Sequence, residues 1–320
     1  MNWLQLGITV ITLGCILGVV VMALNLQYGH GGMVNLGLVA YFAAGAYAYA
    51  IATQPPPSGV DQYVLGLDWP PWAGFILAGA AALLFGLITG PPSLRLRGEY
   101  LAITTFAFAE VFRSLLINER RIGNGTLGLA GIERPYQEAI TFTEYDYVFA
   151  AAAALFAIVT FVVLHRIVAS PYGRLMEAIR DDDVAVVTSG KSVRRVRLSV
   201  FLLAAVFIGW AGAFYVSYTT FATPSLFTAA FTFSIFVALV FGGAGSFWRA
   251  MGGILIIILF EELVRSISFP TLRAAQIATG LQVSAFGLLL ILFLRWQPFI
   301  RWNPLRRFRK PRYERVRGSR

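Results

Sequence analysis

The chain has 320 residues, of which 58% are hydrophobic and 13% are charged, about half the charged fraction of a typical soluble domain. The first 60 residues contain no Asp, Glu, Lys or Arg, and residues 198–248 contain none either. About 20 apolar residues cross the ~30 Å hydrocarbon core of a bilayer, so each uncharged stretch holds more than one crossing. This composition excludes a soluble globular protein and predicts an all-α polytopic membrane protein.

The N-terminal residues, Met1 to Gly7, lack the basic region of a signal peptide, so we expect the first apolar stretch to be a retained membrane helix. It contains the single cysteine, Cys15, which leaves neither a disulfide framework nor a cysteine-based metal site. About nine transmembrane helices are predicted, with a range of eight to ten, at 3–24, 30–53, 72–90, 98–117, 147–168, 197–217, 227–243, 250–267 and 279–295.

Loop charges predict the orientation, because Lys and Arg collect on the cytoplasmic side of a membrane. The charged residues of 54–71 are all acidic and those of 118–146 are mostly acidic, so both loops are predicted outside. The basic loop 169–197 is predicted inside. With nine spans every loop alternates correctly if the N-terminus is outside and the C-terminus is cytoplasmic. We therefore expect a multi-pass membrane protein with this orientation.

The net charge of +10 comes mostly from the C-terminal tail, in which residues 295–320 hold ten Lys or Arg and one acid. Such a tail favours a cytoplasmic anchor that binds anionic lipid over a nucleic-acid-binding arm. The sequence thus divides into a transmembrane domain at 1–295, which includes a cytoplasmic loop at 170–196, and a basic cytoplasmic tail at 296–320.

The second predicted span opens with Tyr28-Gly-His-Gly-Gly-Met-Val-Asn-Leu-Gly37, which holds four glycines. Each glycine weakens a helix by ~1 kcal/mol relative to alanine. Irregular backbone at membrane depth survives only when it is buried in protein or lines a water-filled cavity. Two interpretations follow, an opening onto a transport pathway or close helix packing on small residues. For the pathway the candidates are His30, Gly31, Gly32 and Asn35.

Two intramembrane charges add to these candidates. Glu110 and Arg113 lie three residues apart within an apolar span, on one face of the predicted helix. Charges inside a membrane normally face the bundle interior and pair with each other. They are therefore either a structural pair or part of the translocation pathway.

The longest polar interruption is residues 170–191. Ser170 suits a helix N-cap, Pro171 suits the first helical position, and Gly190 suits the stop, so one amphipathic helix is predicted between them. Three consecutive aspartates, Asp181 to Asp183, would be repelled by anionic headgroups, which favours a protein partner over the membrane surface.

At these residues the chain resembles the cytoplasmic loop of ABC importer permeases for branched-chain amino acids. The resemblance extends to residues 94–103, 108–113, 126–132 and 240–248. Within this family the chain looks like the longer of the two permeases that pair in these systems. The resemblance implies that the loop docks on an ATPase subunit and rocks the permease. The residues that it assigns to this coupling are Tyr172, Gly173, Arg174, Ala178, Ile179, Arg180, Ala185 and Gly190.

The resemblance also implies partners, namely a second related permease, two ATP-binding subunits and a periplasmic solute-binding protein. The chain itself is predicted to be a transport subunit and no enzyme, with no cofactor of its own. Ser189-Gly-Lys-Ser192 is similar to the end of a phosphate-binding loop, but Ala185 stands where the first glycine is needed. ATP would therefore be hydrolysed by the partners. Two alternatives remain, a permease for urea or short amides of the same family and an ion-coupled secondary transporter.

The predicted orientation can be tested by thiol labelling in a Cys15→Ser background. Ser192→Cys and Ser319→Cys should resist a membrane-impermeant thiol reagent added to intact cells, because both positions are predicted to be cytoplasmic. Ser58→Cys should react, because its loop is predicted to be outside. Labelling of Ser192→Cys from outside would contradict the topology.

Overall fold

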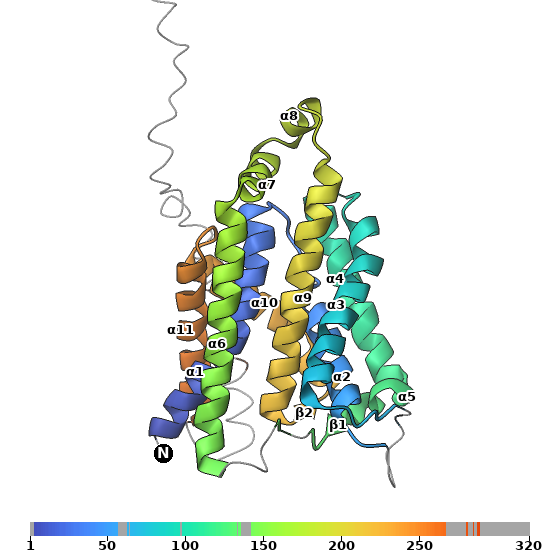
Figure 1. Cartoon of the computed structure of the whole chain (residues 1–320), viewed down its shortest axis with the longest axis vertical. Coiled ribbons are helices and arrows are strands. Elements are labelled where there is room, and N and C mark those ends of the chain that lie inside the picture. Colours follow the sequence, from blue (N-terminus) through green and yellow to red (C-terminus); the bar gives the residue numbers. More distant parts are fainter. Residues whose placement is uncertain are drawn as a thin grey trace, which may run out of the picture.

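The structure, a computed structural model, describes residues 3–56, 63, 65–96, 98–132, 134–135 and 142–266, with positions 280, 284, 287 and 288. Most of the predicted ninth span and all of the basic tail therefore lie outside the described residues. The described part is a bundle of helices that run roughly along one direction (Figure 1). Its main helices are α1 Trp3–Asn25, α2 Leu38–Thr53, α3 Pro71–Ser93, α4 Glu99–Asn118, α6 Phe142–Ala169, α9 Val193–Thr219, α10 Ala229–Gly242 and α11 Phe247–Ser266.

Short elements connect these helices. A π-helical turn, η1 Leu26–His30, continues α1, and two short helices, α7 Pro171–Asp181 and α8 Asp183–Thr188, join α6 to α9. The remaining elements are α5 Arg120–Gly123, the 3₁₀ turns η2 Gly125–Leu127 and η4 Pro224–Leu226, and the strands β1 Leu129–Ala130 and β2 Phe221–Ala222. The two strands pair antiparallel, with Leu129 opposite Ala222.

The helical membrane class is confirmed for the described residues. Five of their helices are long and apolar enough to cross a membrane, namely Leu4–His30, Pro71–Ser93, Glu99–Asn118, Glu144–Ala169 and Val193–Thr219. The first eight predicted spans coincide with described helices to within about five residues, with one exception, and the ninth lies outside the described residues. The second span was predicted to begin at residue 30, but α2 begins at Leu38, because residues 31–37 form no helix.

The short helix α2 lies in the middle of the bundle, packed between α3 and α9. It carries no charge, and nearly all of its residues are buried, with large side chains such as Tyr41, Phe42 and Tyr49 almost completely enclosed. A helix that is apolar on every side is expected to be covered on every side. The core of the protein is therefore built around α2.

Small residues let α2 approach its neighbours. A Cβ atom on Gly45 of α2 would lie 2.1 Å from the carbonyl oxygen of Gly209 of α9, and one on Gly212 would lie 2.1 Å from that of Phe42. Membrane helices often associate in this way, because the hydrophobic effect does not drive apolar side chains out of lipid. Close packing must stabilise the contact between the helices instead. Glycine is therefore required at these crossings.

The connecting segments gather at two ends of the bundle. The helices α7 and α8 project beyond the other elements at one end (Figure 1). The turn after α3 lies at the same end, because Gly90 packs against Leu198 near the start of α9. The start of α11 is also there, with the Phe247 ring 5.3 Å from that of His30. The strands and α5 lie at the opposite end.

Gly45→Ala should destabilise the protein by about 1–3 kcal/mol, because the new methyl group must displace the backbone of α9. The matched change Gly252→Ala in α11 places its Cβ where no other atom lies within 4 Å, so it should leave stability unchanged or slightly raised. Thermal unfolding of the two purified variants in detergent measures the difference. Equal midpoints would contradict the close α2–α9 packing.

Candidate functional site

The loop between α6 and α9 consists of two helices, so the single helix predicted over 171–191 is wrong. Ser170 caps α7 as predicted, with its hydroxyl accepting from the Tyr172 amide at 3.2 Å. Asp182 then takes an extended conformation and caps α8, with its carboxylate accepting from the amides of Val184 and Ala185. An aspartate that bonds the following amides starts a helix more readily than it continues one.

The helix α7 has an inner and an outer face. Met176 and Ile179 are buried against the bundle, with 1% and 2% of their surface exposed, whereas Arg174 and Ala178 are exposed. On α8 only Val186 is buried, and Val184, Ala185 and Val187 face outward. The loop therefore presents a mixed apolar and charged surface away from the bundle.

Close contacts fix α7 to the helices on either side of it. A Cβ atom on Gly173 would lie 2.0 Å from the backbone oxygen of Val168 in α6, so only glycine fits there. The Tyr172 hydroxyl donates to the Val196 carbonyl at 3.2 Å and also contacts the Ser199 hydroxyl of α9. At the far end Gly190 has a φ of +77°, the left-handed conformation that a glycine at a helix stop adopts, in agreement with the stop predicted there.

The glycine-rich segment after α1 is irregular, but most of its amides are bonded within the protein. The amides of Gly31, Gly32 and Met33 donate to carbonyls of the π-helical turn η1. Further along, the Leu36 amide donates to the Thr105 hydroxyl of α4 at 3.1 Å, and the Gly37 amide donates to Asn35 Oδ1 at 2.9 Å. This arrangement meets the requirement that backbone groups away from water find protein partners.

Asn35 is at the centre of this segment and is fully buried. Its Nδ2 donates to Gln27 Oε1 at 3.0 Å, and Gln27 Nε2 donates in turn to the Phe201 carbonyl of α9 at 3.3 Å. A chain of side-chain hydrogen bonds therefore ties the irregular segment to α9 through Gln27 at the end of α1.

The glycines of this segment leave no room for side chains. A Cβ atom on Gly31 would lie 2.8 Å from the Gln27 carbonyl oxygen, and one on Gly32 would lie 2.6 Å from Arg180 Cγ. Gly32 also has a φ of +66°, which other residues rarely adopt. These distances favour close packing as the reason for the glycines, and a role in the pathway stays a prediction.

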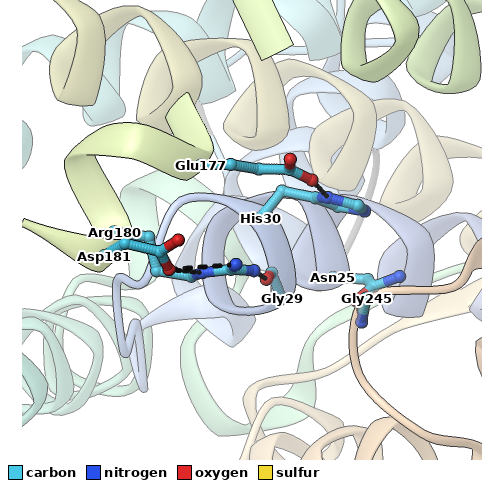
Figure 2. A network of polar contacts seen from close by, with 7 residues as sticks. All are labelled: Asn25, Gly29, His30, Glu177, Arg180, Asp181 and Gly245. Atoms are coloured by element: carbon cyan, nitrogen blue, oxygen red, sulfur yellow. Dashed lines mark hydrogen bonds and ion pairs between the residues drawn. The ribbon is translucent and has the colours of Figure 1, made fainter. Parts of the chain in front are cut away.

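The inner side of α7 contacts the same segment (Figure 2). Glu177 Oε1 lies 3.2 Å from His30 Nδ1, and Arg180 Nη1 donates to the Gly29 carbonyl at 2.6 Å. A carboxylate can only accept, so the proton of this bond belongs to His30 Nδ1. Arg180 also donates from Nε and Nη2 to Asp181 Oδ1. The loop and the first helix are thus joined by charged groups.

The predicted intramembrane pair exists. Arg113 Nε donates to Glu110 Oε2 at 3.1 Å within α4, and about a third of each side chain is exposed. The pair lies on a flank of α4 apart from Phe112, whose ring packs on Phe85 of α3. Such charges are costly in lipid, so this flank is expected to face protein or water.

The predicted site residues form two separate groups in the structure. His30 and Gly32 lie against α7, whereas Glu110 and Arg113 lie on α4, where they pair with each other. Sequence reasoning did not select Glu177, which bonds His30, nor Gln27 and Thr105, which bond the irregular segment. In the sequence these residues stand out only as polar. A polar residue with no characteristic spacing to another does not show which residue it contacts.

Tyr172→Phe should loosen α7 from α9, because it removes a hydrogen bond with a net value of about 0.5–1.5 kcal/mol. We expect faster trypsin cleavage in the loop between α7 and α9. Tyr100→Phe, at an exposed tyrosine of α4, is the matched control and should cleave like the wild type. Equal cleavage of both variants would show that the Tyr172 hydroxyl does not hold the loop.

Comparison with known proteins finds related permeases. The high-affinity branched-chain amino acid transport system permease proteins LivM of Escherichia coli and Salmonella typhimurium are each 29% identical, over 313 and 299 residues. The alignments cover 91% and 87% of this chain but 68% and 65% of those relatives. A probable branched-chain amino acid transport permease protein LivM of Methanocaldococcus jannaschii is 25% identical over 309 residues, 88% of each chain. No solved structure matches significantly.

A protein-family model covers almost the whole chain. The family is described as the permease component of branched-chain amino acid transport systems, and its model matches residues 7–300. The match includes both the central loop and the glycine-rich segment. The chain therefore belongs to the family of branched-chain amino acid transport system permease components.

Proposed function

We propose that this chain is the membrane-spanning permease subunit of an ATP-driven importer for branched-chain and other neutral amino acids. The family match over residues 7–300 and the names of the relatives support the class of solute. The chain would act as a transport subunit, and ATP would be bound and hydrolysed by separate subunits. It would need no cofactor of its own.

The observation that carries this proposal is the position and surface of α7 and α8. They project past the membrane-spanning helices (Figure 1), and their outward side exposes Ala178, Val184 and Val187. Small and apolar side chains that protrude into water beyond a membrane bundle suit a groove on a protein partner. An ATP-binding subunit docked there could drive the permease mechanically.

The rest of the assembly follows from the same proposal. A second related permease would pair with this chain, two ATP-binding subunits would lie on the cytoplasmic side, and a periplasmic binding protein would deliver the solute. The chain would cross the inner membrane nine times, with the N-terminus outside and the C-terminus inside. The basic tail at 296–320 would form a separate cytoplasmic region beyond the permease domain at 1–295.

The solute would pass near the polar groups that the helices hold within the bundle. We include His30, Gly31, Gly32 and Asn35 at the break after α1 in this pathway, together with the ion pair of α4. The ion pair could instead be structural, and the partly exposed flank on which it lies supports contact with the second permease or with water. Urea and short amides are the alternative solutes.

Reconstitution in liposomes tests the proposal. The chain, a second permease, the ATP-binding subunits and the binding protein should together import leucine, isoleucine or valine only when ATP is present on the loop side. Import of urea or acetamide with no import of amino acids would support the alternative solute. Import by this chain alone along an ion gradient would refute the ATP-driven importer in favour of a secondary transporter.

Ala178→Arg should abolish this ATP-dependent import, because the new charge would enter a contact from which water is excluded. The ATP-binding subunits should no longer co-purify, or should hydrolyse ATP without transport. Gly190→Val should act similarly by straining the turn after α8. Asn118→Arg, exposed at the opposite end of the bundle, is the control and should assemble normally. Full import by both loop variants would remove the support for docking at α7 and α8.

A further inference from the structure

The contact between α7 and the end of α1 joins the loop that projects from the bundle to the bundle interior. We call the four residues that form it, Gly29, His30, Glu177 and Arg180, the α1–α7 clamp (Figure 2). Two charged groups of α7 bind two consecutive residues of the π-helical turn, one through a backbone carbonyl and one through a side chain. His30 is almost completely buried, so its bond to Glu177 is shielded from water on the histidine side.

The turn that the clamp holds is the unusual part of α1. A π-helical turn holds more residues than an α-helical turn, so it can exchange with α-helix by a shift of one residue, and such turns are frequent at functional sites. Gly29 in this turn has no free space, because a Cβ atom there would lie 2.2 Å from Asn25 Oδ1 and 2.6 Å from the Gly245 amide. The backbone at Gly29 is therefore packed closely against Asn25 and the Gly245 amide, so a displacement of Gly29 would reach both of these neighbours.

Two routes lead away from the clamp into the bundle. Asn25 Oδ1 accepts from the Gly245 amide at 2.8 Å, which ties the end of α1 to the turn between α10 and α11. On the other side, the irregular segment from Gly31 to Gly37 connects the clamp to α2 and is bonded to Thr105 of α4. The same four residues thus contact both paths along which a shift could spread.

Two buried polar atoms, one in the clamp and one next to it, are left without a hydrogen bond within the described residues. They are His30 Nε2 and Asn25 Nδ2. A buried polar atom without a partner raises the free energy of the conformation that contains it. A second conformation in which these atoms gain partners would be correspondingly favoured, which is a property expected of a two-state element.

From these contacts we propose that Glu177 and Arg180 are positioning residues that convert movement of α7 into a rearrangement of the π-helical turn and of the segment 31–37 behind it. Arg180 pulls on the Gly29 carbonyl, and Glu177 holds the His30 ring. The outward face of α7 contacts the ATPase, whereas these inward groups pass the motion on. The proposal rests on the importer function proposed above, and it assigns the inner face of α7 a task distinct from docking.

The test is the number of solute molecules imported per ATP hydrolysed by the reconstituted complex. For Arg180→Gln and Glu177→Ala we expect normal co-purification of the ATP-binding subunits, continued hydrolysis, and a fall of about tenfold in this ratio, within the usual range of coupling between sites. Gly32→Ala should reproduce the defect without removing a charge, because its methyl group would push against Arg180 Cγ. Arg194→Gln, an exposed arginine at the start of α9, is the matched control and should keep the wild-type ratio.

A structural measurement complements the ratio. In the wild-type complex a non-hydrolysable ATP analogue should change the hydrogen exchange of amides in residues 26–37, and Arg180→Gln should suppress that change. An unchanged ratio in all three clamp variants would overturn the proposal, and so would loss of ATPase binding, which would make these residues part of the docking surface. Equal loss of folded complex in the three variants would show a purely structural role. A wild-type chain that does not bind ATP-binding subunits would instead refute the importer itself.

Discussion

The structure depends on one constraint, that every backbone polar group inside the bundle must be bonded by protein. Helices meet it automatically, and residues 31–37 do not form a helix. There the amides of Gly31 to Met33 are bonded by carbonyls of the π-helical turn, and those of Leu36 and Gly37 by the side chains of Thr105 and Asn35. These bonds replace the helical ones that the segment lacks, so they restrict the conformations that it can adopt inside the bundle.

The same constraint explains why the central helix is short. The chain uses residues 31–37 to enter the bundle before α2 begins at Leu38, so α2 occupies only part of the depth that α1 and α9 span. Its start lies among other helices, and it has no polar side to present to water. The core and the irregular segment are therefore parts of one arrangement, and a change in either alters the packing of the other.

The sequence predicts the membrane helices well, because the bilayer demands apolar segments of a fixed length and charge patterns locate their ends. Ser170 and Gly190 were also readable, since capping depends on residues close in sequence. The division at Asp182 was not, because three adjacent aspartates suit the polar face of one helix as well as a cap between two.

The contacts across the fold were beyond sequence reasoning. Arg180 was expected to face a partner protein, but its guanidinium bonds the Gly29 carbonyl of its own chain, 151 residues away. The pairing of His30 with Glu177 is equally distant in sequence. Hydrophobic periodicity shows which side of a helix is apolar. It does not show where a long, flexible charged side chain on the border between the two faces will bend.

The absence of charged side chains on α2 also bears on how the protein is made. During synthesis α2 enters the membrane long before α9, its principal neighbour, has been translated. In water such a helix would aggregate, but lipid tails solvate an uncharged apolar surface well, so α2 can wait in the bilayer until its partners arrive. Glycines such as Gly45 cost little stability in that lipid-exposed state. Their small size becomes necessary only when α9 packs against α2. The order of insertion and the final packing thus place compatible demands on the same sixteen residues.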